Sequence, residues 1–211
     1  MFLIFHNFLC YFFTTFLTTL FDIHSIPLFS KYLPLFKIAS ADITNVPLLK
    51  AISLQKKPIL LSTGASQLDE IKFALKTLKL PKEQVCIMHC VLNYPTKDEN
   101  ANLMFIEVLK KKFNKYIIGY SDHVSPDDNL TSLEVAWNYG AQIIEKHFTY
   151  NKNKKGNDHY HSADKNDFIK FYERIKKIEM LKGSGFKDLG KEKNSIMYAR
   201  RSIVSKVKIN K

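Results

Sequence analysis

Short apolar runs alternate with amphipathic stretches along most of this chain, at a spacing of about 25 to 30 residues. The apolar runs have the length and composition of buried strands, and each intervening stretch is long enough to form a helix. Strands joined by such crossovers run parallel, so the repeat predicts an α/β fold. Six strands are expected, at residues 16–20, 36–40, 59–62, 85–89, 116–120 and 143–147.

Five helices are expected between and after these strands. Asn45 precedes the first and Ser66 the second, and both residue types accept hydrogen bonds from the free amide groups at a helix start. Asp69 and Glu70 then fall in the first turn of the second helix, where negative charge is favourable. Gly140 follows the fourth helix, in the position that often adopts a left-handed conformation. The expected helices span residues 46–55, 68–79, 101–112, 129–139 and 164–181.

Six βα units fit either an open doubly wound sheet or most of a closed barrel. No GxGxxG motif occurs, and no GxxxxGK is followed by the Ser or Thr that a P-loop requires, which argues against dinucleotide and P-loop binding. Polar residues recur where the expected strands end, and in α/β barrels that end of the strands carries the active site. We therefore favour the barrel. The polar residues are Lys37, Ser40, Ser62, Thr63, His89, Cys90, Ser121, Asp122, His123, Glu145, Lys146 and His147.

Two histidines stand at the ends of neighbouring expected strands. Side chains alternate along a strand, so His123 shares a face with Ser121, and His147 shares a face with Glu145. Two neutral imidazoles, with further positions left to water and substrate, make an open divalent-metal site for Lewis-acid chemistry. Asp122 or Glu145 would orient one of the rings. The alternative for each histidine is a structural role in the core.

An anion site is the second expectation at these strand ends. Lys37, together with the hydroxyls of Ser40, Ser62 and Ser121, supplies the cation and the short donors that a phosphate or carboxylate needs. The alternative is that each serine only starts a turn or caps a helix.

Two other patterns carry weaker expectations. Asp158, His159 and His161 lie in a polar loop, but their spacing is not typical of a zinc cluster, so none is expected there. Cys90 follows His89 on an expected strand, where a cysteine usually behaves as a small hydrophobic residue and not as a nucleophile.

The net charge limits the expected binding partners, and the cysteine content limits the expected cellular compartment. The chain has 32 Lys and Arg against 20 acidic residues, a net charge of +12, which attracts phosphate in any form. Residues 187–211 are strongly basic but have a single aromatic residue, Tyr198, and not the series of interleaved aromatic residues that stack on bases, so nucleic acid is not an expected partner. Three cysteines without a CxxC pair favour a reducing compartment, and we expect the cytoplasm.

The first 21 residues are uncharged at neutral pH and long enough to span a bilayer. They lack the basic residues and the cleavage site of a secretory signal. We therefore expect a stretch that is partly a buried strand and partly foreign to the fold, without membrane insertion. The alternative is a membrane-tethered protein.

Seven ordered segments are similar to the sialic acid synthase family. The sequences of residues 89–96 and 156–161 are most similar to those of the branch that makes legionaminic acid. The segments are FKIASADITNVPLL (36–49), LLSTGAS (60–66), MHCVLNYPT (88–96), IIGYSDH (117–123), GAQIIEKHFT (140–149), GNDHYHSAD (156–164) and ARRSIV (199–204).

The resemblance implies an incomplete TIM (β/α)8 barrel with about six of the eight βα units, strands three to eight. It also implies an enzyme that condenses phosphoenolpyruvate with an N-acylated hexosamine, either N-acetylmannosamine or its 2,4-diacetamido-6-deoxy analogue. The products are a sialic or legionaminic acid and phosphate. A divalent metal, Mn or Mg, polarises the open-chain aldehyde, and members of the family form homodimers.

The resemblance also implies roles for individual residues. Glu145 would lie beside the metal and take part in catalysis with the two histidines. The metal ligands are His123 and His147, the phosphoenolpyruvate contacts are Lys37, Ser40, Ser62 and Ser121, and the sugar contacts are Tyr94 and Asp158.

Two departures from the family are expected to matter. The family's barrel begins with two further βα units, whereas residues 16–22 align with its third strand, and the family continues past ARRSIV into an antifreeze-like domain. We therefore expect a non-matching hydrophobic segment at 1–14, a partial synthase barrel at 15–186, and a basic tail at 187–211 that leads toward that absent domain. An incomplete barrel exposes strand edges. The competing hypothesis is an inactive remnant that at most binds metal and phosphate.

Overall fold

The computed structural model describes residues 15–156 and 158–210, so the expected segment 1–14 lies outside the described residues. The chain divides into two compact units, residues 1–172 and 173–211, and the boundary falls within helix α7 (Lys165–Lys182). Each unit is considered by itself.

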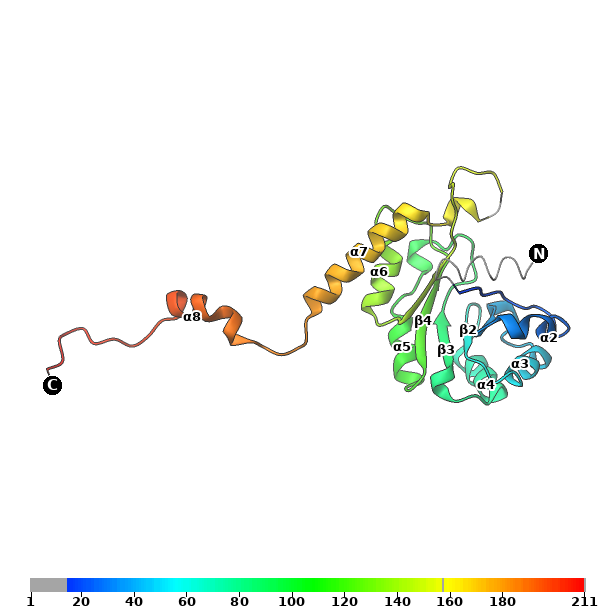
Figure 1. Cartoon of the computed structure of the whole chain (residues 1–211), viewed down its shortest axis with the longest axis horizontal. Helices are drawn as coiled ribbons and strands as arrows, with labels where there is room; N and C mark the ends of the chain where they lie inside the picture. The colour runs from blue at the N-terminus through cyan, green and yellow to red at the C-terminus, as the bar shows by residue number, and fades with distance from the viewer. Residues whose placement is uncertain (1–14, 157, 211) are drawn as a thin grey trace. The chain divides into compact units, whose positions relative to one another are not determined.

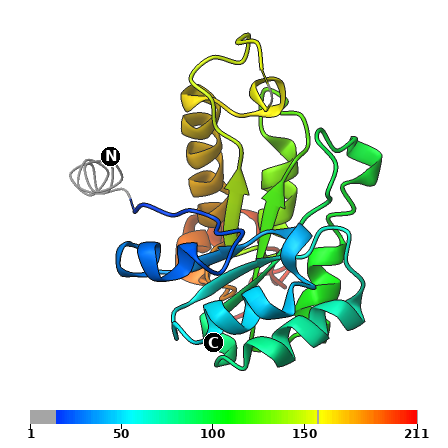
Figure 2. The same cartoon turned by 90° about the vertical axis from the view of Figure 1, so that its right-hand side faces the viewer.

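The first unit is built on a parallel sheet whose strands follow one another in chain order, β1-β2-β3-β4-β5. The described residues form five strands that curl into half a barrel (Figure 2), which confirms the α/β barrel architecture. Each strand pairs with the next in sequence because each crossover returns the chain to the adjacent position. The strands are β1 (Phe36–Ile38), β2 (Ile59–Ser62), β3 (Val85–His89), β4 (Ile117–Asp122) and β5 (Ile143–Lys146).

The strand expected at residues 16–20 is reduced to a single parallel bridge between Thr19 and Lys37. Leu20 is buried, but Leu17 and Phe21 are 37% and 66% exposed. The apolar run therefore buries too little of its length to extend the ladder beyond one residue.

Four helices lie on the outer side of the curled sheet (Figure 1). Asn45 caps the first of them as expected, since its side chain accepts from the Leu48 amide at 3.3 Å. The second begins at Leu68 as expected, but its N-cap is Gln67 and not Ser66. The Gln67 amide donates to Glu70 Oε2 at 2.8 Å, and the Ser66 hydroxyl donates to a backbone oxygen instead. The helices are α3 (Val46–Ser53), α4 (Leu68–Leu78), α5 (Phe105–Lys112) and α6 (Thr131–Asn138).

Alternation along the strands divides the sheet into two faces. The outer face carries residues such as Ile38, Leu61 and Ile87, which pack against the helices in the main core. The inner face carries Leu60 and Met88 in a smaller cluster. Residues on both faces of β2 and β3 are buried, which explains why these strands read as continuous apolar runs. Polar residues on the inner face therefore point into the half-barrel.

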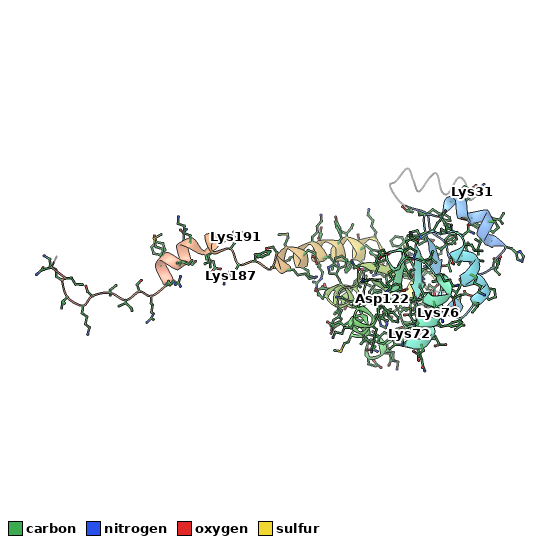
Figure 3. All side chains as sticks on the ribbon, turned by 90° about the horizontal axis from the view of Figure 1, so that it is seen from below. Lys31, Lys72, Lys76, Asp122, Lys187 and Lys191 are labelled. Carbon is green, nitrogen blue, oxygen red and sulfur yellow. The ribbon has the colours of Figure 1, made fainter. Side chains whose placement is uncertain are left out.

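The second unit comprises the end of α7, a 3-10 turn η6 (Leu189–Glu192) and the short helix α8 (Lys193–Ala199). Its side chains are largely exposed, and those of Lys187 and Lys191, labelled in Figure 3, are 75% and 83% exposed. Within the described part of the chain, no helix is both long and apolar enough to cross a membrane.

Candidate active site at the carboxyl ends of the strands

A cluster of three polar side chains connects the first and the last strand on the inner side of the half-barrel. Lys37 lies on β1 and Glu145 on β5, yet Lys37 Nζ is 3.4 Å from Glu145 Oε1. Ser121 faces Glu145 in the β4–β5 register and donates a hydrogen bond to the same carboxylate oxygen at 3.0 Å. Lys37 and Ser121 are nearly buried, whereas the Glu145 side chain is 40% exposed. The curl of the sheet thus brings three of the expected site residues together.

Ser40 belongs to a second, tightly packed group. The Gly64 amide donates to Ser40 Oγ at 2.9 Å and to Cys90 Sγ at 3.1 Å, and these two side-chain atoms lie 3.0 Å apart. A Cβ atom at Gly64 would approach Ser40 Oγ to 2.9 Å, so a glycine is needed for this close contact. Cys90 is therefore packed against a backbone amide and a hydroxyl, as a buried structural thiol would be.

Ser62 is the expected anion contact that is left without a partner. It lies at the end of β2 and is 2% exposed, and its hydroxyl makes no hydrogen bond to any described residue. A buried hydroxyl without a partner carries a desolvation cost of about 1–3 kcal/mol. This hydroxyl is thus free to bind a ligand.

His123 and His147 come together at the ends of β4 and β5, with ring centroids 5.5 Å apart. His123 Nδ1 lies 2.6 Å from the Val91 carbonyl oxygen, an arrangement in which Nδ1 donates and Nε2 keeps its lone pair. Burial lowers the pKa of His123, which favours this neutral form. Tyr94 packs on His123 with a distance of 4.0 Å between the ring centroids, and Tyr94 is 46% exposed.

Asp158 faces the histidines from the following loop. Its Oδ2 lies 3.7 Å from His147 Nδ1, and its Oδ1 lies 3.7 Å from Nε2 of His161. The ligand atoms of His147, Asp158 and His161 all lie within 4.8 Å of one another, which makes them a candidate metal site. His161 was not expected here, because loop spacing does not reveal that β5 and the loop turn the two imidazoles toward one carboxylate. The three-residue spacing of Asp158 and His161 was the only sequence feature on which this pairing could have been predicted.

Asp122 does not orient either histidine ring, and that expectation is wrong. Alternation turns Asp122 to the outer face, where it forms a fully buried ion pair with Lys146 at 2.8 Å. Tyr120 donates to Asp122 Oδ1 at 2.6 Å, and Ser132 donates to Oδ2 at 3.1 Å. Figure 3 labels Asp122 within the body of the first unit. The Asp122 carboxylate therefore has a structural role between the sheet and the helices.

Comparisons with known proteins agree on one family. Residues 13–187 match the NeuB family. The chain is 40% identical over 199 residues to an uncharacterised protein of Methanocaldococcus jannaschii, covering 93% of this chain and 58% of that protein. It is 38% identical over 201 residues to the N,N'-diacetyllegionaminic acid synthase of Campylobacter jejuni, covering 93% of this chain and 59% of the synthase. The chain thus spans less than two thirds of either relative.

The fold comparison gives the same result. A crystal structure of N-acetylneuraminic acid synthetase from Leptospira borgpetersenii, in complex with citrate, superposes with a TM-score of 0.77 and 31% identity. The match covers 90% of this chain and 67% of that chain.

Proposed function

Because the chain belongs to the NeuB family, whose relatives include legionaminic and sialic acid synthases, we propose that it carries the condensing site of a nonulosonic acid synthase. The proposed substrates are phosphoenolpyruvate and an N-acylated hexosamine, N-acetylmannosamine or its 2,4-diacetamido-6-deoxy analogue. The methylene carbon of phosphoenolpyruvate forms a bond to the sugar aldehyde carbon, whose oxygen takes up a proton. Water adds to the neighbouring carbon, which bears the phosphate, and the C–O bond from that carbon to phosphate breaks. One nonulosonate and one phosphate result.

The unpartnered hydroxyl of Ser62 is the observation that carries the proposal. It lies on the inner face of the half-barrel, as do Lys37 and Ser121. A cation with nearby hydroxyl donors suits a molecule that is both a phosphate and a carboxylate. In the proposed complex Lys37, Ser40, Ser62 and Ser121 hold phosphoenolpyruvate, and Glu145 keeps Lys37 and Ser121 in position.

His123 and His147 are the residues that would hold a divalent cation, Mn or Mg. The donor set fits, because the Nε2 lone pair of His123 is not used by the Val91 contact and the His147 side chain is 30% exposed. Such a cation supplies Lewis acidity that polarises an aldehyde oxygen.

Tyr94 and Asp158 are the proposed contacts to the amino sugar. Both side chains are about half exposed and border the two histidines, Tyr94 through its ring and Asp158 through its carboxylate. The Tyr160 hydroxyl donates to the Tyr94 backbone oxygen at 3.1 Å, which ties the loop after β5 to the segment after β3. The sugar would therefore bind between these two segments.

The test is an assay of the purified chain with phosphoenolpyruvate, Mn²⁺ and each of the two sugars, with nonulosonate measured by mass spectrometry and phosphate by colorimetry. We expect equal amounts of both products. In Ser62→Ala, which removes only the unpartnered hydroxyl, kcat/KM should fall by about 10-fold or more, while the stability of the chain without ligand should not fall, because the desolvation cost of that hydroxyl is removed. Absence of product from a folded wild-type chain would instead support the inactive remnant.

A further inference from the structure

His161 is the most unusual buried group in the described chain. Its side chain is completely buried, yet neither Nδ1 nor Nε2 has a hydrogen-bond partner among the described residues. The ring packs on Tyr160 and His147 at centroid distances of 4.8 Å each, contacts that satisfy neither nitrogen. Leaving a buried polar group unpaired is costly. The arrangement therefore indicates a ligand for this imidazole.

The groups nearest to His161 are suited to a cation. The Asp158 carboxylate lies 3.7 Å from His161 Nε2 through one oxygen and 3.7 Å from His147 Nδ1 through the other. Donor atoms that share a tetrahedral zinc ion at bond lengths near 2.1 Å lie about 3.4 Å apart. These two separations need to close by only a few tenths of an ångström, whereas the widest separation among the three ligand atoms, which is within 4.8 Å, needs to close by more. The Asp158 side chain is 54% exposed and can move to close it.

We propose that His161 completes a cation site with His147 and Asp158, and that this site selects a nitrogen-preferring divalent transition metal, such as Zn²⁺ or Co²⁺, over Mg²⁺. Two imidazoles and one carboxylate are the donor set of many zinc and iron sites, whereas magnesium prefers oxygen ligands alone. The inference deepens the proposed function, because His147 is shared with the pair proposed to hold the catalytic cation, and it narrows that cation to a transition metal and excludes Mg. The catalytic use of the bound metal rests on the proposed function, whereas metal binding itself can be measured without substrate.

A bridging water is the competing explanation for the buried ring. A water molecule between His161 and Asp158 would satisfy one nitrogen without selecting any metal. Metal affinity separates the two explanations.

The experiment titrates the full chain with Co²⁺ and follows the visible absorption bands that nitrogen coordination of cobalt produces, with phosphoenolpyruvate and sugar absent. Wild type is expected to bind one Co²⁺, which Zn²⁺ displaces and a large excess of Mg²⁺ does not. His161→Phe keeps the ring volume without either nitrogen, and Asp158→Asn changes an exposed group that does not support the core. Each variant should weaken binding by about 100-fold or more, since even changes to groups that only orient ligands cost 10–100-fold.

The matched control is His159→Asn, in the same 3-10 turn, η5 (His159–His161). His159 Nδ1 already pairs with the Thr149 hydroxyl at 2.8 Å, so its loss should leave cobalt affinity unchanged. Circular dichroism checks that His161→Phe is folded, and Asp158→Asn keeps the test valid if it is not. Unchanged affinity in both Asp158→Asn and a folded His161→Phe, or equal displacement by Mg²⁺ and Zn²⁺, would overturn the inference. Failure of the synthase assay with cobalt binding intact would count against the proposed function alone.

Discussion

Polar residues alternate between the two faces of strands β4 and β5. The residues on the two faces differ in how deeply they are buried and in how many partners they have. On the outer face Asp122 and Lys146 are fully buried, and Asp122 also accepts from Tyr120, the Val124 amide and Ser132. On the inner face Glu145 has two partners but is 40% exposed.

The difference distinguishes a structural network from a binding site. Both carboxylate oxygens of Asp122 on the outer face are used by the protein itself, so this group offers no acceptor to a ligand. The inner side retains the unpartnered Ser62 hydroxyl and, in the adjoining loop, the unpartnered His161 ring. Polar groups that the protein leaves unsatisfied indicate where a substrate or an ion would bind.

The largest effect is expected from Lys146→Met, which breaks the outer network. The change leaves the Asp122 carboxylate buried without its cation, and removal of one partner of a buried ion pair costs about 3–5 kcal/mol. Urea unfolding followed by circular dichroism measures the loss. Lys72→Met is the control, because its pair with Asp69 is exposed and should contribute little to the free energy of unfolding. Equal losses in the two variants would contradict the comparison.

Gly64→Ala tests whether the inner side is tightly packed where Ser40 lies. The added Cβ would meet Ser40 Oγ at 2.9 Å, Cys90 Sγ at 3.0 Å and the Leu92 amide nitrogen at 3.2 Å. Overpacking of this kind costs about 1–3 kcal/mol, and we expect a loss in that range by the same urea measurement. A stable Gly64→Ala protein would show that this part of the site is loose.

Lys37→Met makes the same chemical change on the inner face as Lys146→Met makes on the outer one. Glu145 can be hydrated when its partner is removed, so the stability should change by less than about 1 kcal/mol. Affinity for phosphoenolpyruvate, measured by calorimetry, should fall by about 10- to 100-fold, as expected for loss of a charged hydrogen bond. A large stability loss with unchanged affinity would reverse the roles assigned to the two faces.

The smallest effect is expected at Cys86, on the inner face. Burial and the nearby Glu145 carboxylate raise the pKa of its thiol to about 12. The thiol therefore stays protonated at neutral pH, and the reactive thiolate forms only as the pH approaches that value or as the chain unfolds. Iodoacetamide at pH 8, followed by peptide mass mapping, should leave Cys86 unmodified in the native protein and label it in urea. Rapid native labelling at Cys86 would contradict its placement.

The sequence allowed the βα order and the face shared by Ser121 and His123 to be predicted, because strand alternation and helix periodicity are local properties. It did not allow the contact between Lys37 and Glu145 to be predicted, since that contact depends on how strongly the sheet curls. The expectation that Asp122 orients a histidine ring was wrong, because a polar residue at a strand end does not reveal that Lys146 is its buried partner. His161 was missed for a related reason, since loop conformation decides its direction.

The strand order also has a consequence for synthesis. Every strand pairs with its immediate successor in the chain, from β1 to β5. As the polypeptide leaves the ribosome, each new βα unit therefore finds its pairing edge already exposed by the unit made just before it. No strand needs to wait for a distant part of the chain, and the sheet is able to grow in the order in which it is translated.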